Sequence, residues 1–241
     1  MTSRISNGAG NIRNILEVRN VSKHFGGVNA VESCSFQVEE GKITSLIGPN
    51  GAGKTTAFNI ITGVIRSDTG RIFLDGKDIT RKQVHEIALS GISRTFQQAR
   101  LFKNLSVLEN LTIASSASPE AIKELLASMH FYKDLSTPCC DLSYGQQRIV
   151  EIARALLFEH KLLLLDEPTA GLNQKARQEL KNILRNLKKK KSTILLIEHD
   201  MDFVMDISDE VIVMAQGMVL TRGPPCAIRK DPKVLEVYLG K

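Results

Sequence analysis

Apolar and β-branched residues gather in short runs along this chain, and the runs predict the strands of an α/β domain. Three runs consist mainly of apolar and β-branched residues, at residues 43–47, 162–165 and 193–197. Such runs are typical of strands that are buried on both faces of a parallel sheet. Apolar residues then return at helical spacing over residues 149–157. Strands that alternate with helices predict an α/β fold.

The N-terminal part of the chain follows a different pattern. Residues 15–21 alternate between apolar and polar, and residues 28–38 are strand-like again after Gly26-Gly27. This pattern predicts an antiparallel β portion ahead of the first buried strand. Residues 1–14 are polar and contain glycine, and we expect them to form a loose tail. We expect residues 15–241 to form a single domain.

Local signals in the middle of the chain predict a helical subdomain over about residues 94–157. Ser or Thr followed three residues later by Glu or Gln is a capping box, and it occurs at Thr80 and Ser106. The small, polar segment 115–119 predicts a surface linker. Residues 120–130 then predict a helix.

A glycine-rich segment separates the run at 43–47 from a predicted helix, and it fits the phosphate-loop pattern. It reads Gly48-Pro49-Asn50-Gly51-Ala52-Gly53-Lys54-Thr55-Thr56. Glycines allow positive φ, so successive N–H groups can point into one concavity at a helix N-terminus. We expect Lys54 to contact the outer phosphates of a nucleotide and the Thr55 hydroxyl to bind Mg²⁺.

Polar side chains follow three of the predicted strands, at the edge where α/β proteins bind ligands. They are Gln97, Asp166, Glu167 and His199. Burying the two carboxylates without a function would be costly. Asp166 fits the role of a Mg²⁺ ligand, and Glu167 can accept a proton from an attacking water. Gln97 could ligate Mg²⁺ or position water, and His199 could bond a phosphate or be structural.

Two further positions have both a functional and a structural interpretation. Ser143 precedes apolar residues at helical spacing, so its hydroxyl could help to bind an anion or form a plain N-cap. Phe25 stands at a predicted strand end beside glycines. Its ring could stack on a nucleotide base or pack in the core.

The composition is that of a globular domain. The chain has 241 residues, of which 42% are hydrophobic and 24% charged, and no apolar run approaches the roughly 20 residues of a membrane span. The net charge is +6, which we interpret as a solubilising surface. Lysines 188–191 complement the dipole of a helix C-terminus, which favours a solvated end over a nucleic-acid site. None of the four cysteines forms a Cys-x-x-Cys pair, so we expect reduced thiols and a cytoplasmic protein.

Taken together, the motifs resemble an ATP-binding subunit of an ABC transporter, from residue 15 to the C-terminus. The resemblance is carried by the loop at residues 48–56, Gln97, Leu142-Ser143-Tyr144-Gly145-Gln146-Gln147, Asp166-Glu167 and His199, in this order. Finer detail is similar to the branched-chain (hydrophobic) amino-acid uptake family. That detail comprises Arg94-Thr95-Phe96-Gln97, Ala170-Gly171-Leu172-Asn173, Glu198-His199-Asp200-Met201 and Val237-Tyr238-Leu239-Gly240.

The resemblance implies a P-loop ABC ATPase cassette with a RecA-like core, an N-terminal antiparallel β portion and a helical subdomain. It implies ATP and Mg²⁺ as cofactors, with Phe25 on the adenine and residues 48–56 around the phosphates. It also implies Thr55, Gln97 and Asp166 at the metal. Glu167 would be the base and His199 the γ-phosphate contact. Ser143 and Gly145 would contact the ATP held by an opposite subunit.

The implied partners are a second ATPase subunit, identical or paralogous, and an integral membrane permease fed by a solute-binding protein. The subunit would lie on the cytoplasmic face of the inner membrane and drive import, without a role for nucleic acid. The solute itself stays open, because it never touches this subunit.

Some positions depart from the family pattern, and two other functions remain as alternatives. Tyr144 replaces the commonest glycine, Asn173 replaces an Asp, Gln174 replaces a Pro, and residues 111–141 form a short segment. One alternative is an ABC-type ATPase of another system, including one that acts on nucleic acid or ribosomes. Such proteins usually carry tandem cassettes or a long coiled coil. The other is an ATP-binding switch with negligible turnover, against which Glu167 argues.

Overall fold

The computed structural model describes residues 13–95, 100–113 and 115–239, and its strands form two sheets. A six-stranded sheet has the order β10-β9-β3-β8-β7-β6, in which only β10 is antiparallel to its neighbour. Its strands are β3 (Ile43–Ile47), β6 (Ile92–Arg94), β7 (Leu162–Asp166), β8 (Ile194–Ile197), β9 (Glu210–Ala215) and β10 (Met218–Gly223). An antiparallel sheet has the order β2-β1-β4-β5, with β1 (Asn14–Phe25), β2 (Val28–Glu39), β4 (Thr69–Leu74) and β5 (Lys77–Asp78).

The three apolar runs form the inner strands β3, β7 and β8, and all their residues are buried. The leucines and isoleucines of β7 and β8 alternate between two hydrophobic cores, because successive residues of a strand face opposite sides of the sheet. β3 contributes Ile43 and Leu46 to these two cores and Ile47 to a third. In β7, Leu162 and Leu164 belong to the core shared with the antiparallel sheet. Leu163 and Leu165 belong to the core shared with the helical part of the chain. The predicted α/β fold with an antiparallel β portion is therefore confirmed.

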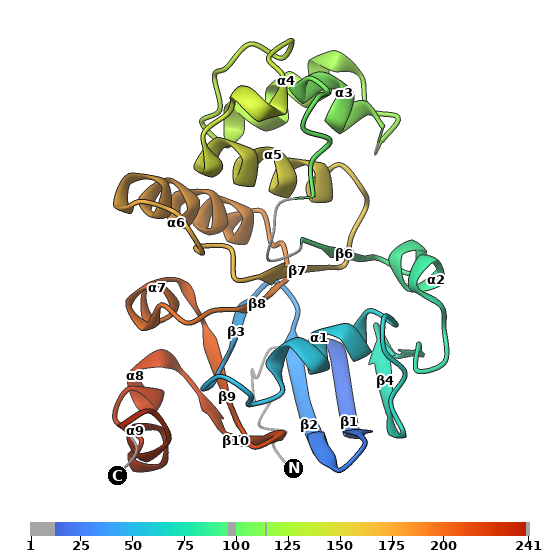
Figure 1. Ribbon diagram of the computed structural model, residues 1–241, viewed down its shortest axis with the longest axis vertical. Coiled ribbons are helices and arrows are strands. Elements are labelled where there is room, and N and C mark those ends of the chain that lie inside the picture. Colours follow the sequence, from blue (N-terminus) through green and yellow to red (C-terminus); the bar gives the residue numbers. More distant parts are fainter. Residues whose placement is uncertain (1–12, 96–99, 114, 240–241) are drawn as a thin grey trace, which may run out of the picture.

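Helices cover both faces of the parallel sheet (Figure 1). α1 (Lys54–Ile61) packs Phe58 into the core beneath β1, β2 and β4. On the other face lies α6 (Gln174–Lys189), whose N-cap is Asn173. The remaining helices of the core region are α2 (Val84–Leu89), α7 (Met201–Ile207), α8 (Pro225–Ile228) and α9 (Pro232–Leu239).

The helical part of the chain gathers at one end of the molecule, drawn green to yellow in Figure 1. It consists of α3 (Val107–Thr112), α4 (Pro119–Ser128), the 3₁₀ turn η1 (Cys139–Asp141) and α5 (Tyr144–Leu156). Ser106, Ser118 and Ser143 cap α3, α4 and α5 by accepting a backbone N–H at each N-terminus. The capping box predicted at Ser106 is thereby confirmed.

Several element boundaries differ from the sequence-based prediction. The helix expected to start at the Thr80 capping box starts after Gln83, because the Thr80 hydroxyl instead bonds the Ile72 amide and the Asp78 carboxylate. The short helix α7 was not predicted, and Asp200 caps it by accepting from the Phe203 amide at 3.0 Å. Strand β1 already includes Asn14, so the expected tail ends at least one residue earlier.

The structure also bears on the state of the cysteines and on whether a helix could cross a membrane. All four cysteines are free, as expected, and two of them are buried. Among the described residues, none of the helices combines the length and the apolar character that a membrane crossing demands.

The turn from β3 into α1 depends on glycines that lie very close to other backbone segments. Gly53 has φ +95°, and a Cβ atom there would lie 2.3 Å from the Ala30 carbonyl oxygen. A Cβ atom at Gly48 would lie 2.2 Å from the Met214 carbonyl oxygen. Gly51 also has positive φ, +81°, but a Cβ atom there would meet nothing within 4 Å. The loop is therefore pressed onto β2 and β9 at two of its three glycines.

This difference predicts unequal effects of two alanine substitutions. Gly51→Ala should lower the free energy of unfolding by only about 1–2 kcal/mol, the cost of a left-handed conformation for a residue with Cβ. Gly53→Ala should cost a further ~1–3 kcal/mol, because backbone must move to relieve the clash. Urea unfolding of both variants measures the gap. Equal stabilities would contradict the close approach at Gly53.

Candidate nucleotide site

The sheet brings the predicted site residues to one edge. β3, β7 and β8 are parallel neighbours, and Asp166 pairs in register with Ile197. The glycine loop, Glu167 and the pair Glu198-His199 therefore follow the ends of neighbouring strands at the same edge of the sheet. A cavity of about 370 Å³ opens at this edge. Its walls are residues 50–56, Glu167, His199 and the segment Val28-Asn29-Ala30.

Lys54 spans the glycine loop from its place at the start of α1. Its side chain is buried, and Nζ donates to the carbonyl oxygens of Gly48 at 2.7 Å and Pro49 at 2.9 Å. Burial lowers the pKa of Lys54 below its ordinary value, and the carboxylates of Glu167 and Asp166 oppose that shift. The amine lies beside backbone N–H groups at a helix N-terminus, a combination suited to phosphate binding.

Glu167 and His199 meet in the wall of the same cavity. Glu167 Oε1 lies 2.8 Å from His199 Nε2. Glu167 has φ +46°, which is uncommon for a residue with a Cβ atom. Its backbone N–H donates to the Ile197 carbonyl at 3.0 Å, so the backbone that carries this side chain is anchored to the neighbouring strand. The structure thus brings together two side chains that are 32 residues apart in the sequence.

Asp166 lies beside the cavity and forms a buried ion pair with Arg94. The distance from Arg94 Nη2 to Asp166 Oδ2 is 2.9 Å. Arg94 Nη1 also donates to Asn59 Oδ1 at 2.8 Å and to Thr62 Oγ1 at 2.9 Å. The guanidinium therefore links the end of β7 to helix α1. Asp166 is not among the residues that line the cavity.

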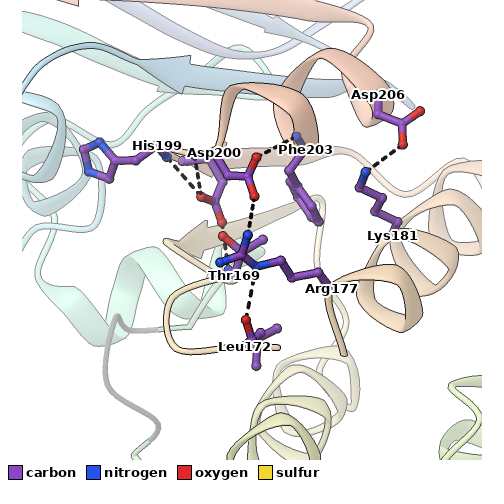
Figure 2. A network of polar contacts seen from close by, with 9 residues as sticks. Thr169, Leu172, Arg177, Lys181, His199, Asp200, Phe203 and Asp206 are labelled. Carbon is purple, nitrogen blue, oxygen red and sulfur yellow. Dashed lines mark hydrogen bonds and ion pairs between the residues drawn. The ribbon is translucent and has the colours of Figure 1, made fainter. Parts of the chain in front are cut away.

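Glu198 joins the loop after β7 to the loop after β8, and Figure 2 shows two residues that it contacts, Thr169 and His199. Its carboxylate is buried and accepts from the backbone N–H groups of Thr169 at 2.8 Å and His199 at 3.0 Å. Burial raises the pKa of Glu198, and these hydrogen bonds oppose the rise. The figure also shows Arg177 bonded to Asp200 and to the Leu172 carbonyl. The loop after β7 and the loop that carries His199 are therefore joined as one unit.

Of the predicted nucleotide-binding residues, Gly48 and Pro49 at the start of the loop do not line the cavity, and neither do Ser143, Gly145 and Phe25. Ser143 is exposed and occupied as an N-cap: its hydroxyl accepts from the Gln146 amide at 3.3 Å. Gly145 packs against α6, since a Cβ atom there would lie 3.0 Å from Ala176 Cβ. Phe25, 47% exposed at the end of β1, has the Lys23 ammonium 5.4 Å from its ring centroid. The prediction for Gln97 falls in residues 96–99, outside the described residues.

Sequence reasoning missed several residues that shape the site. The wall segment Val28-Asn29-Ala30 follows the predicted strand end at Phe25, and only the pairing of β1 with β2 places it beside the loop. Arg94 and Glu198 lie inside motifs that were recognised, but their roles depend on tertiary contacts. A charged residue within an apolar strand end is the signal that could have drawn attention to both.

Comparisons with known proteins agree with this geometry. A family model described as ABC transporter matches residues 31–170. The high-affinity branched-chain amino acid transport ATP-binding protein BraF of Pseudomonas aeruginosa is 40% identical over 95% of this chain and 99% of its own. The crystal structure of the ATP-binding cassette MJ1267 in its ADP conformation has a TM-score of 0.87 and 35% identity, covering 95% and 100% of the two chains.

A dimeric structure provides a further comparison. The dimeric structure of MJ0796, a bacterial ABC transporter cassette, has a TM-score of 0.78 and 25% identity, and it covers 87% of this chain and 98% of that one. The fold and the phosphate loop define an ATP-binding cassette, and the chain belongs to the ABC transporter family. It is an ATPase and serves as the ATP-binding subunit of such a transporter.

The contacts of Lys54 lead to a first prediction about this site. Lys54→Ala should remove the charge-assisted contact to the nucleotide that we expect of this residue, worth about 1.5–3 kcal/mol. ATP affinity should fall by roughly ten- to a hundredfold. Titration with a fluorescent ATP analogue measures this. Lys181→Ala is the control, because Lys181 pairs with Asp206 on the surface. Unchanged affinity in folded Lys54→Ala would refute the role of Lys54.

Proposed function

We propose that this subunit hydrolyses ATP to drive the import of branched-chain amino acids, or a related small polar solute, through a membrane permease. The observation that carries the proposal is the meeting of Lys54, Glu167 and His199 in one cavity at the glycine loop. The name of BraF supports the solute class. The subunit would lie on the cytoplasmic face of the inner membrane and receive its solute indirectly, from a binding protein.

The reaction is in-line attack of water on the γ-phosphate. Loop N–H groups and Lys54 bind the β- and γ-phosphates and stabilise the charge that develops on them. Glu167 accepts a proton from the water as the new oxygen–phosphorus bond forms and the bond to ADP breaks. His199, 2.8 Å from Glu167, orients that carboxylate and donates to the γ-phosphate. Phe25, 47% exposed beside the cavity wall, is proposed to stack on adenine.

The residues at the loop suit Mg²⁺, which prefers hard oxygen ligands together with substrate phosphates. Thr55 lines the cavity, and Asp166 ends strand β7. The ion pair to Arg94 uses Oδ2 of Asp166, so Oδ1 lies outside that pair. We propose Thr55, Asp166 and Gln97 as the residues that hold the metal. When bound, Mg²⁺ would neutralise charge on the phosphates.

A second ATPase subunit would complete the site. Ser143 and Gly145 do not line the cavity of their own chain, and a dimeric cassette is among the similar structures. We propose that they contact the ATP held by the facing subunit, which is either a second copy or a paralogue. Ser143 lies exposed at the N-terminus of α5, where N–H groups and the helix dipole favour phosphate.

A base-deficient variant tests hydrolysis and dimerisation together. Glu167→Gln keeps the size of the side chain but cannot accept a proton, so hydrolysis should slow by about 10²–10⁴-fold. Bound ATP should then persist and hold the dimer closed. Size-exclusion chromatography with ATP and Mg²⁺ should show a dimer for Glu167→Gln and mostly monomer for the wild type. If the partner is a paralogue, the dimer should require both chains.

Ser143→Arg, added to Glu167→Gln, provides the control for that experiment. A bulky cation at the start of α5 should block the facing nucleotide site and abolish the dimer. A Glu167→Gln chain that stays monomeric with and without a paralogue, and hydrolyses ATP at the wild-type rate, would show that Glu167 is not the base.

A groove between the sheet and the helical part is the proposed docking place of the permease. It has a volume of about 500 Å³ and lies between α2, β6 and α5. Leu89 and Phe158 line it and are 86% and 52% exposed. Arg94 also lines it, three residues before Gln97 in the sequence. A cytoplasmic loop of the permease with apolar side chains would cover this surface.

Charge placed in the groove should prevent docking. Leu89→Glu combined with Phe158→Glu should strongly reduce co-purification with the co-expressed permease, because two carboxylates would be buried in the interface. ATP affinity of the isolated subunit should stay within about twofold of wild type. Val64→Glu is the matched control, since Val64 is 52% exposed outside the groove. Normal co-purification of the double variant would place the permease elsewhere.

A further inference from the structure

Arg148 is buried in the first half of α5 and reaches the turn that carries Glu167. Only 2% of its surface is exposed. Nη2 donates to the carbonyl oxygens of Asp166 at 2.8 Å and Glu167 at 3.0 Å, and Nε donates to the Pro168 carbonyl at 3.3 Å. One guanidinium therefore binds three successive backbone carbonyls at the end of β7.

The charge of Arg148 is balanced within its own helix. Glu151, one turn further along α5, accepts from Arg148 Nη1 and is 2% exposed. A buried ion pair contributes little net stability compared with well-packed apolar residues. The ion pair matters here for geometry, because it orients the guanidinium of Arg148 toward the turn after β7 instead of toward solvent.

The turn that Arg148 holds is conformationally restrained. Glu167 adopts φ +46°, a conformation that persists only when surrounding contacts enforce it. Glu198 holds the same turn from the opposite side through the Thr169 amide. A shift of Arg148 therefore moves carbonyls on both sides of the Glu167 Cα atom, and the carboxylate follows.

Helix α5 connects this clamp to the exposed Ser143. The N-cap Ser143 and Arg148 are five positions apart, or about 7.5 Å at 1.5 Å per residue. This stretch is continuous α-helix, so it moves as one body. Because α5 begins at the residue proposed to touch the partner's ATP, both ends of the connection bear on nucleotide.

We propose that Arg148 is a positioning residue that couples the two ATP sites of the dimer. ATP bound by the facing subunit fixes the position of the start of α5 through Ser143. Arg148 moves with α5, so its hydrogen bonds set the position of the turn that carries Glu167 in the same chain. Glu167 acts on the other ATP, so each bound nucleotide readies the base for its neighbour. The inference rests on the proposed sandwich dimer.

Arg148→Lys tests the coupling, because lysine keeps the positive charge but has no fork to bind several carbonyls. Binding of a fluorescent ATP analogue to the single subunit should stay within about twofold of wild type. In the assembly that hydrolyses ATP, kcat should fall by roughly ten- to a hundredfold, as for a misplaced catalytic group. The Hill coefficient for ATP should fall from near 2 to near 1, since two coupled sites allow at most 2.

Two further variants make the result decisive. Arg185→Lys, at an exposed pair with Asp206, should leave binding, kcat and the Hill coefficient unchanged. If Arg148→Lys does not fold, Arg148→Met combined with Glu151→Leu replaces the buried pair by apolar residues, and the same loss of cooperativity is expected.

Three outcomes would overturn the coupling. One is a wild-type Hill coefficient in the folded Arg148 variant, whatever its kcat, because lower kcat with intact cooperativity means local support only. Another is an equal effect of Arg185→Lys. The third is a wild-type protein that does not hydrolyse ATP together with a Glu167→Gln variant that does not dimerise. That result would refute the proposed function and the coupling with it.

Discussion

The site depends on the burial of β3, β7 and β8 from both sides. Alternate leucines and isoleucines of β7 and β8 enter two separate cores, and β3 adds Ile43 and Leu46 to these cores and Ile47 to a third. Loss of packing on either face would therefore expose apolar side chains of these strands. Burial of apolar surface contributes ~25 cal/mol per Å², and a shift in register would move these side chains out of their cores. The burial therefore fixes the register of the strands. Register in turn sets where the glycine loop, Glu167 and His199 leave the sheet.

Around this edge, buried charges are placed where they bind backbone or each other. Arg94 pairs with Asp166 and reaches α1, Arg148 holds the carbonyls after β7, and Glu198 accepts amides from two loops. Each buried ion would be costly alone, and each is compensated by a charge partner or by hydrogen bonds. Together these contacts connect β6, α1 and α5 to the loops after β7 and β8, which carry Glu167 and His199.

The sequence was informative where one local cause decides structure. The leucines 162–165 predicted a strand buried on both faces, and the glycines before Lys54 predicted a tight strand-to-helix turn, and both are confirmed. The misses have the opposite origin. Thr80 had two polar partners available, and the tertiary one prevailed over the capping box. The cavity wall at Val28–Ala30 and the reach of Arg148 arise from pairing and packing that no local pattern encodes.

The left-handed conformation of Glu167 has an evolutionary consequence. A side chain with Cβ loses about 1–2 kcal/mol there relative to glycine, in a domain whose total stability is typically only about 5–15 kcal/mol. Glycine would relax the backbone, but it would remove the carboxylate that reaches His199. With Glu167 as the proposed base, stability and turnover would make opposing demands on this one position. Drift in a lineage released from the need to hydrolyse ATP should favour its loss early.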